Sequence, residues 1–271
     1  MNDKIRQAHF SEVAGGYDSA RDLDEIIINL LAEEISNGPN VPALDLATGT
    51  ARYPIEIARR FGHRFVGFDA NSEMLETGKK NAAEQGLTEK VELIHGNCYD
   101  LSPVNGDRIY GVVTMMNALH HFENLSLLAK QVKVVLHEEG TWIIYTRTED
   151  DNQRTIWGEC FPEFAAKEKK YLGKSGFSVD RLDDELKKGG MKIVTIKRYD
   201  LAREHTLREL LEKVDARHYS TFREYDDNDI ATARTGFIGN IHERYPETRD
   251  NPHYKIRHVS PMSVVYVKPI T

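Results

Sequence analysis

A turn of small residues between a predicted strand and a predicted helix constrains the fold of this chain more than any other feature. The turn lies in residues 44–52, which read Leu-Asp-Leu-Ala-Thr-Gly-Thr-Ala-Arg. Small side chains at positions 47, 49 and 51 let the backbone bend tightly and approach a ligand without clashes of Cβ atoms. Asp45 places an anion beside this turn, which favours a cationic ligand group such as an ammonium and repels a pyrophosphate.

A second acidic residue follows the next strand at a spacing that indicates a nucleoside site. Asp69 directly follows the predicted strand Phe65–Phe68, 20 positions after Gly49. An acidic side chain at this place accepts hydrogen bonds from both ribose hydroxyls of a bound nucleoside. Met74, one turn into the following helix, could cover an adenine face. The residues after the third strand could hydrogen-bond the adenine edge: Asn97, Cys98 and Tyr99.

Short apolar runs alternate with amphipathic stretches, which is typical of a doubly wound α/β sheet. Strands are predicted at residues 41–46, 65–68, 91–94, 109–116, 142–145, 191–198 and 263–268. The helix after the second strand is predicted to be capped by Ser72. Two long irregular segments interrupt the later part of the pattern, and they indicate a cap over the carboxyl ends of the strands, where open α/β sheets bind ligands.

Composition narrows the class of protein. The chain has 271 residues, 40% of them hydrophobic, which can bury one large core or a core plus a cap. A formal net charge of −7 argues against a broad phosphate-binding surface, so no nucleic-acid partner is expected. No apolar run is long enough for a membrane helix, and the first ten residues do not read as a signal peptide. With two cysteines and no metal-ligand spacing, we expect a cytoplasmic protein without a metal site or a membrane partner.

Five segments together resemble the class I S-adenosylmethionine-dependent methyltransferases. Residues 45–51 are similar to motif I, with alanine in place of its first and third glycines. Residues 68–75 resemble the ribose-binding segment, and residues 96–101 the adenine-binding segment, with Asn97 where aspartate is common. Residues 117–122 resemble the segment after the fourth strand, and residues 14–18 resemble the Ala-x-x-Tyr-Asp motif near the start of the domain.

The resemblance implies a fold, an activity and a set of site residues. The implied fold is a Rossmann-like doubly wound, seven-stranded, mostly parallel sheet with an antiparallel last strand and a helical cap insertion. The implied activity is transfer of a methyl group from S-adenosyl-L-methionine to an O, N or C nucleophile of a small molecule by in-line displacement. The implied cofactor-binding residues are Tyr17, Arg21, Asp45, Ala47, Thr48, Gly49, Asp69, Ala70, Met74, Asn97, Cys98, Tyr99 and Asn117.

Three residues are candidates for a catalytic role. His120 and His121 stand where the family places substrate-facing residues, and either imidazole could act as a general base near neutral pH. Tyr17 corresponds to a tyrosine that often lies near the transferred methyl group. An amine nucleophile would need no base, so the need for one stays open, as do the methylated atom and the oligomeric state.

The pattern divides the chain into five segments. Residues 1–150 are expected to form the cofactor-binding core with an N-terminal helical segment, and residues 151–177 a first cap insertion. Residues 178–200 are expected to return to the core as a helix and a strand. Residues 201–260 are expected to form a helical insertion that sets substrate choice, and residues 261–271 the last core strand.

Three other functions remain as alternatives. A nicotinamide-dependent oxidoreductase shares the plan of strand, turn and acidic residue, but it requires a G-x-G-x-x-G run that residues 47–52 lack. A non-catalytic S-adenosylmethionine-binding protein could use the same fold. A nucleic-acid or protein methyltransferase is a third alternative. The negative charge and the sequence Asn-Ala-Leu-His at 117–120 favour a small metabolite instead.

Overall fold

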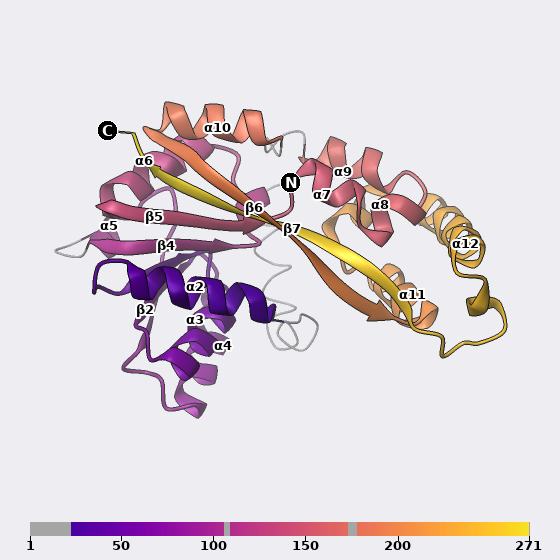
Figure 1. Cartoon of the computed structure of the whole chain (residues 1–271), viewed down its shortest axis with the longest axis horizontal. Coiled ribbons are helices and arrows are strands. Elements are labelled where there is room, and N and C mark those ends of the chain that lie inside the picture. The colour runs from indigo at the N-terminus through magenta and orange to yellow at the C-terminus, as the bar shows by residue number, and fades with distance from the viewer. Residues whose placement is uncertain (1–22, 106–108, 173–177, 271) are drawn as a thin grey trace. The chain divides into compact units, whose positions relative to one another are not determined.

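A computed structural model describes residues 23–105, 109–172 and 178–270. Its core is a seven-stranded sheet in the order β3-β2-β1-β4-β5-β7-β6 (Figure 1). The pairs from β3 to β5 are parallel, and β7 runs in the opposite direction to β6, as predicted. The strands are β1 (Ala43–Leu46), β2 (Phe65–Asp69), β3 (Val91–His95), β4 (Tyr110–Met116), β5 (Leu136–Thr146), β6 (Met191–His205) and β7 (Ile256–Pro269).

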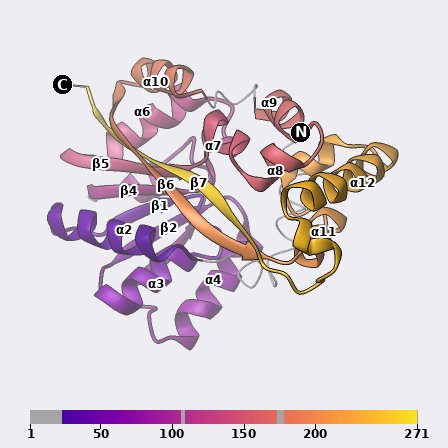
Figure 2. The same cartoon turned by 45° about the vertical axis from the view of Figure 1, so that its right-hand side comes forward.

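The central strands are buried because helices cover both faces of the sheet. Every residue of β1 is buried, and so are the first six residues of β4 beside it. Helices α2 (Glu25–Asn37), α3 (Arg52–Phe61) and α4 (Ser72–Glu84) lie together on one face of the sheet (Figure 2). On the other face lie α6 (Leu125–Val135) and α10 (Val179–Lys188), and the short α5 (Ser102–Asn105) contacts α6.

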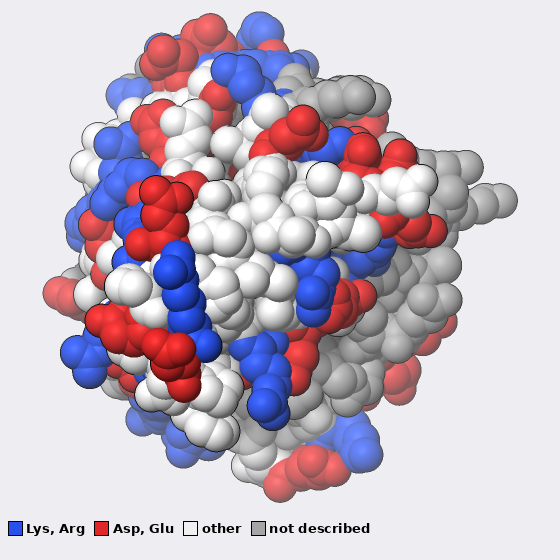
Figure 3. Space-filling model, turned by 90° about the vertical axis from the view of Figure 1, so that its right-hand side faces the viewer, with Lys and Arg blue, Asp and Glu red and all other residues white. Residues whose placement is uncertain are grey.

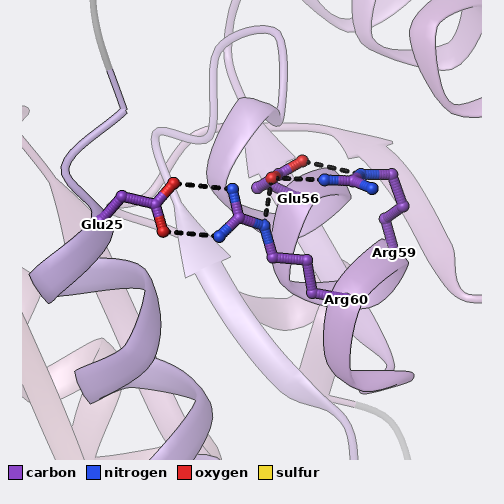
Figure 4. A network of polar contacts seen from close by, with 4 residues as sticks. All are labelled: Glu25, Glu56, Arg59 and Arg60. Carbon is purple, nitrogen blue, oxygen red and sulfur yellow. Dashed lines mark hydrogen bonds and ion pairs between the residues drawn. The ribbon is translucent and has the colours of Figure 1, made fainter.

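A network of four charged side chains joins α2 to α3 (Figure 4). The Arg60 guanidinium donates two hydrogen bonds to the Glu25 carboxylate, at 2.6 and 2.8 Å. Arg60 and Arg59 both donate to Glu56, one turn earlier on the same helix. The Arg60–Glu25 pair is largely exposed, so its contribution to stability is small.

The chain divides into two compact units. The first contains the described residues up to Tyr145, Asp183–Ile196 and the end of β7 from Val265, and the second contains Thr146–Leu182 and Lys197–Val264. Two strands belong to both units. Strand β6 begins in the first unit and ends in the second, and strand β7 begins in the second unit and ends in the first.

The second unit is mainly helical around an aromatic core. Its helices are α7 (Glu149–Gln153), α8 (Ile156–Cys160), α9 (Phe164–Leu172), α11 (Leu207–Asp215) and α12 (Asp227–Arg244), with 3-10 turns η3 (Ser220–Glu224) and η4 (Pro246–Arg249). The Trp157 ring lies 5.3 Å from the rings of Phe222 and Phe237, measured between centroids. Such contacts explain why segments without clear periodicity still fold.

The bounds of three predicted strands and the position of one helix cap were wrong. Strand β5 begins at Leu136 instead of residue 142, β6 extends to His205 and β7 begins at Ile256. Helix α4 is capped by Asn71, whose side chain accepts the Met74 N–H at 2.9 Å, and Ser72 is the first helical residue. Asn71 was missed because two capping residue types stand next to each other.

No helix of the described part of the chain is long and apolar enough to cross a membrane. Within the same residues, no group of three or more metal-ligating side chains comes together.

Candidate cofactor site

The turn after β1 takes a left-handed backbone at alternate positions. The φ angles are 53° at Ala47, 58° at Gly49 and 56° at Ala51. A left-handed alanine costs roughly 1–2 kcal/mol, so this turn holds strain at two of the three positions. No atom of the described residues lies within 4 Å of the place where a Cβ of Gly49 would stand. Among these residues the turn therefore has open space at its middle position, as a close approach of a ligand to the backbone requires.

The Asp69 carboxylate ties this turn to the end of β2. Its Oδ2 accepts the Gly49 N–H at 2.8 Å, and its Oδ1 accepts the Asn71 N–H at 2.8 Å. Burial raises the pKa of Asp69, while these backbone hydrogen bonds lower it. A carboxylate oxygen can accept more than one hydrogen bond, so both oxygens retain acceptor capacity for the hydroxyls of a ribose. Ala70, next in the chain, is exposed beside this carboxylate.

The Asp45 carboxyl is buried within the sheet itself. Asp45 pairs with Thr114 across β1 and β4, and the Thr114 hydroxyl donates to Asp45 Oδ1 at 2.6 Å. Burial raises the pKa of Asp45 to about 6, partly offset by this hydrogen bond and reinforced by the nearby charge of Asp69. Thr114 was not predicted from the sequence, because its contact with Asp45 depends on the register of two strands that are distant in the chain.

The loop after β3 lies beside the small-residue turn. Asn97 is exposed, and its amide oxygen accepts the Tyr99 N–H at 2.9 Å. Cys98 is buried, and desolvation raises the pKa of its thiol to about 12, partly offset by a backbone hydrogen bond at Ala47. The Tyr99 hydroxyl accepts the Asn124 N–H at 3.0 Å. Cys98 therefore stays a neutral thiol that contacts the turn, and it is not an activated nucleophile.

Two further predicted cofactor residues are buried. Met74 is 3% exposed in the first turn of α4, where its backbone N–H is bound by the Asn71 cap. Thr48 is buried, and its backbone N–H and carbonyl bond Phe68 and Ala51. Thr48 thus lies in the turn that carries Gly49, and Met74 lies in the helix that follows Asp69.

The predicted base stands in the turn after β4. Asn117 has φ 55°, and its backbone N–H bonds the Tyr145 carbonyl at 2.8 Å. His120 and His121 follow in the turn η2 (Leu119–His121), half-buried, with ring centroids 3.9 Å apart. Because β4 lies parallel to β1, this turn and the small-residue turn are at the same edge of the sheet. Tyr17 and Arg21 lie outside the described residues.

Known proteins are similar in sequence to the part of the chain that carries these loops. A family described as "Methyltransferase domain" matches residues 43–140, from β1 into β5. The ubiquinone/menaquinone biosynthesis C-methyltransferase UbiE of Bradyrhizobium sp. is 31% identical over 140 residues, which cover 47% of this chain and 54% of that protein. The match thus spans about half the length of that relative.

Solved structures are similar over nearly the whole chain. The S-adenosylmethionine-dependent methyltransferase of Geobacter sulfurreducens, in complex with S-adenosyl-L-homocysteine, has a TM-score of 0.52 at 17% identity, covering 97% of this chain and 98% of that one. The [4+2]-cyclase SpnF has a TM-score of 0.57 at 15% identity, covering 91% of this chain and 82% of that one. These likenesses show the fold. Residues 43–140 therefore carry a methyltransferase domain, and the sheet order of the described chain is that of the Rossmann-like fold of class I S-adenosylmethionine-dependent methyltransferases, a family whose methyl donor is S-adenosylmethionine.

Proposed function

We propose that this chain transfers a methyl group from S-adenosyl-L-methionine to a small-molecule acceptor by in-line displacement. The observation that carries the proposal is the Asp69 carboxylate at the end of β2, which accepts the Gly49 N–H at 2.8 Å, beside a Gly49 Cβ position that no described atom approaches within 4 Å. In that arrangement the carboxylate would bind the ribose of the cofactor, and the turn would lie against its methionine moiety. The C-methyltransferase named above supports an acceptor of metabolite size.

The residues around the turn fit this cofactor. Asp69 would accept the ribose hydroxyls beside Ala70, and the backbone of 47–49 would lie along the methionine moiety. The Asp45 carboxyl has a pKa of about 6. An approaching ammonium would lower this pKa and so favour the charged carboxylate. Met74, Asn97, Cys98 and Tyr99 would surround the adenine, and Asn117 would line the turn after β4. Tyr17, on the motif at 14–18, and Arg21, one helical turn beyond it in the sequence, are proposed as further cofactor contacts.

When bound, the cofactor supplies an already activated methyl group on a sulfonium, so the protein contributes mainly alignment. Holding reacting atoms in line is worth roughly 7–11 kcal/mol in well-oriented reactions. His120 or His121 would accept the proton of a hydroxyl or an acidic carbon of the acceptor. Tyr17 is proposed to lie near the transferred methyl group.

We assign acceptor recognition to the second unit, with its helices and aromatic core, as the cap expected at 151–177 and 201–260. The distribution of charge on the surface also supports a small acceptor and not a nucleic acid. On the face that Figure 3 shows, basic and acidic side chains are interspersed among uncharged residues. The two cysteines are free and buried, which supports a cytoplasmic location.

The test is a methyl-transfer screen. The protein is incubated with S-adenosyl-L-methionine and a panel of quinols, phenols, amines and carboxylic acids, and products are examined for a mass gain of one methyl group. We expect transfer to at least one acceptor, with S-adenosyl-L-homocysteine formed in equal amount. Transfer that also occurs without the protein would contradict the proposal, as would binding of NAD in preference to S-adenosyl-L-methionine.

A second candidate is a protein that binds the cofactor without transferring its methyl group. It is favoured by one observation, namely that a [4+2]-cyclase has the same fold. Tight binding of S-adenosyl-L-methionine with no methylated product across the panel would favour this candidate.

A further inference from the structure

Two half-buried cations of the second unit differ from their neighbours in having no carboxylate partner within the described residues. Arg147 lies between β5 and α7, and Lys213 lies on α11. At least nine other cations of the unit have a carboxylate oxygen within 4.0 Å: Arg154, Lys167, Lys169, Arg198, Arg217, Arg234, Arg244, Lys255 and Arg257. Partial burial of a cation without a counter-charge is unfavourable, so the exceptions require an explanation.

Both cations contact only neutral groups, and both retain donors. Arg147 donates from Nη2 to the Ser260 hydroxyl at 2.6 Å and from Nε to the Pro261 carbonyl at 3.3 Å. A guanidinium has five N–H donors, so three remain after these two bonds. The Lys213 ammonium contacts His205 Nε2 at 3.0 Å, which leaves two of its three donors.

Two imidazoles connect Lys213 to β7, the strand that accepts the hydrogen bonds of Arg147. A charged Lys213 can only donate, so His205 accepts through Nε2 and carries its proton on Nδ1. His205 Nδ1 lies 3.0 Å from His258 Nε2, which it therefore donates to. His258 stands two residues before Ser260 on β7, so both side chains point to the same face of that strand. The Arg147 and Lys213 cations thus approach one stretch of β7 from two elements.

The charges around His258 are mostly positive. Burial lowers the pKa of His258, and Lys213, Arg203 and Arg147 lower it further. Arg147 acts on one carboxyl of the unit, that of Glu168 on α9, whose pKa it lowers and whose Oε1 accepts from Thr221 at 3.3 Å. Burial raises the pKa of Glu168 to about 7, against the opposing effect of Arg147, so at neutral pH this carboxyl only partly balances the cations.

We propose that Arg147 and Lys213, with His205 and His258 between them, form a binding site for the anionic group of a small molecule, a carboxylate or a phosphate. Arg147 binds either group through paired donors, and Lys213 adds a second charge. That this anion is part of the methyl acceptor rests on the proposed function, and it makes the acceptor an organic acid or a phosphorylated metabolite.

The first test uses the wild-type protein, without cofactor, and two probes, inorganic phosphate and acetate, at constant ionic strength. Histidine NMR signals are followed as each probe is added. A bound anion offsets the neighbouring cations, so the pKa of His258 rises towards its ordinary value with saturable dependence on the probe. The probe that saturates at lower concentration identifies the class of anion. The absence of a saturable change with either probe would overturn the proposal.

The second test uses variants and calorimetry with the better probe. Arg147→Gln and Lys213→Gln are each expected to weaken binding at least tenfold, as the loss of a charged hydrogen bond does. The matched control is Arg154→Gln, whose guanidinium in the same unit pairs with Asp200 at 2.6 Å, and we expect binding within twofold of wild type. Equal weakening in all three variants would indicate a general charge effect and contradict the site. Neither test uses methyl transfer, so the anion site and the proposed function can fail separately.

Discussion

The Asp69 carboxylate accepts the backbone N–H of Gly49 at 2.8 Å, although 20 residues separate the two in the chain. The same carboxylate accepts the Asn71 N–H through its other oxygen. One side chain therefore fixes two loops, the turn after β1 and the start of α4, before any ligand binds. Preorganisation of this kind reduces the cost of ordering the loops on binding.

Replacing Asp69 is expected to affect both binding and stability. Asp69→Ala removes an acceptor for two ribose hydroxyls and two backbone N–H groups. Since charged hydrogen bonds contribute about 1.5–3 kcal/mol each, affinity for S-adenosyl-L-homocysteine should fall at least tenfold by calorimetry, with a lower unfolding temperature. Asp69→Asn, which keeps one acceptor oxygen, should lose less of both. Unchanged affinity in Asp69→Ala would remove the assignment of this residue to the cofactor.

The pH dependence of stability should reveal the buried Asp45. Its folded pKa, about 6, lies above the ordinary 3.8, so between these values the folded protein keeps a proton that the unfolded chain releases. Stability from this group is therefore lost as pH rises from about 4 to about 6, by about 3 kcal/mol. Asp45→Asn should remove that loss and raise the free energy of unfolding at pH 8, measured with urea. An unaltered profile in the variant would show that Asp45 is not the group responsible.

The affinity for the cofactor should change with pH in the opposite direction to stability, because of the same Asp45 carboxyl. An ammonium is attracted by the ionised Asp45, so the affinity for S-adenosyl-L-methionine should decline as pH falls through about 6. In Asp45→Asn the affinity should be weaker at pH 8 and should lose this step. Calorimetry at several pH values measures both, and a step of equal size in the variant would assign the titration elsewhere.

The left-handed alanines of the turn should respond differently to glycine. At Ala47, which is half-buried, glycine relieves backbone strain of roughly 1 kcal/mol, so Ala47→Gly should be as stable as wild type or more so. Ala51 has the same strain but is fully buried in a cluster with Ile55, Ala58 and Ala82, so Ala51→Gly also loses a buried methyl, worth about 1 kcal/mol. Chemical denaturation should rank Ala47→Gly above Ala51→Gly, and the reverse order would contradict this account.

The histidine pair can be tested once an acceptor is known. If His120 or His121 is the base, its replacement by alanine should reduce turnover about 10²–10⁴-fold while cofactor affinity stays near wild type. Because the centroids of the two rings lie only 3.9 Å apart, each single variant needs a cofactor titration as its control. Full activity in both variants would mean that catalysis depends on alignment alone or on a base elsewhere, such as His218.

The role of the second unit can be tested by removing part of it. Replacing residues 203–258 by a short turn removes α11 and α12 but keeps the cores of β6 and β7 in the sheet. Turnover should be lost, while S-adenosyl-L-homocysteine should still bind. Methyl transfer at the wild-type rate in this variant would separate the second unit from the active site.

The sequence was sufficient for the parts of the site that depend on local spacing. A turn of small residues and an acid at the next strand end both follow from the chain alone, and the Gly49–Asp69 contact joins them. Contacts across the sheet were not accessible, since the pairing of Asp45 with Thr114 depends on register. The length of β6 was missed because the covered positions near its end hold Arg203 and His205. The burial of residues 199–205 alternates, but the sequence there lacks the alternation of apolar and polar residues that marks a half-buried strand.

The position of β7 between β5 and β6 has a consequence for the order in which this molecule can assemble. Strand β7 is the last of the seven in chain order, yet it stands inside the sheet, and β6 is the edge strand of the sheet that the described residues form. During synthesis the five strands β1 to β5 can pair as they emerge, but β6 must wait until β7 has been made. Until then β5 exposes an open edge, where unwanted pairing with other chains begins. Correct assembly of the whole sheet thus depends on a single late insertion, and substitutions in β7 should reduce folding yield more than equal changes in the earlier strands.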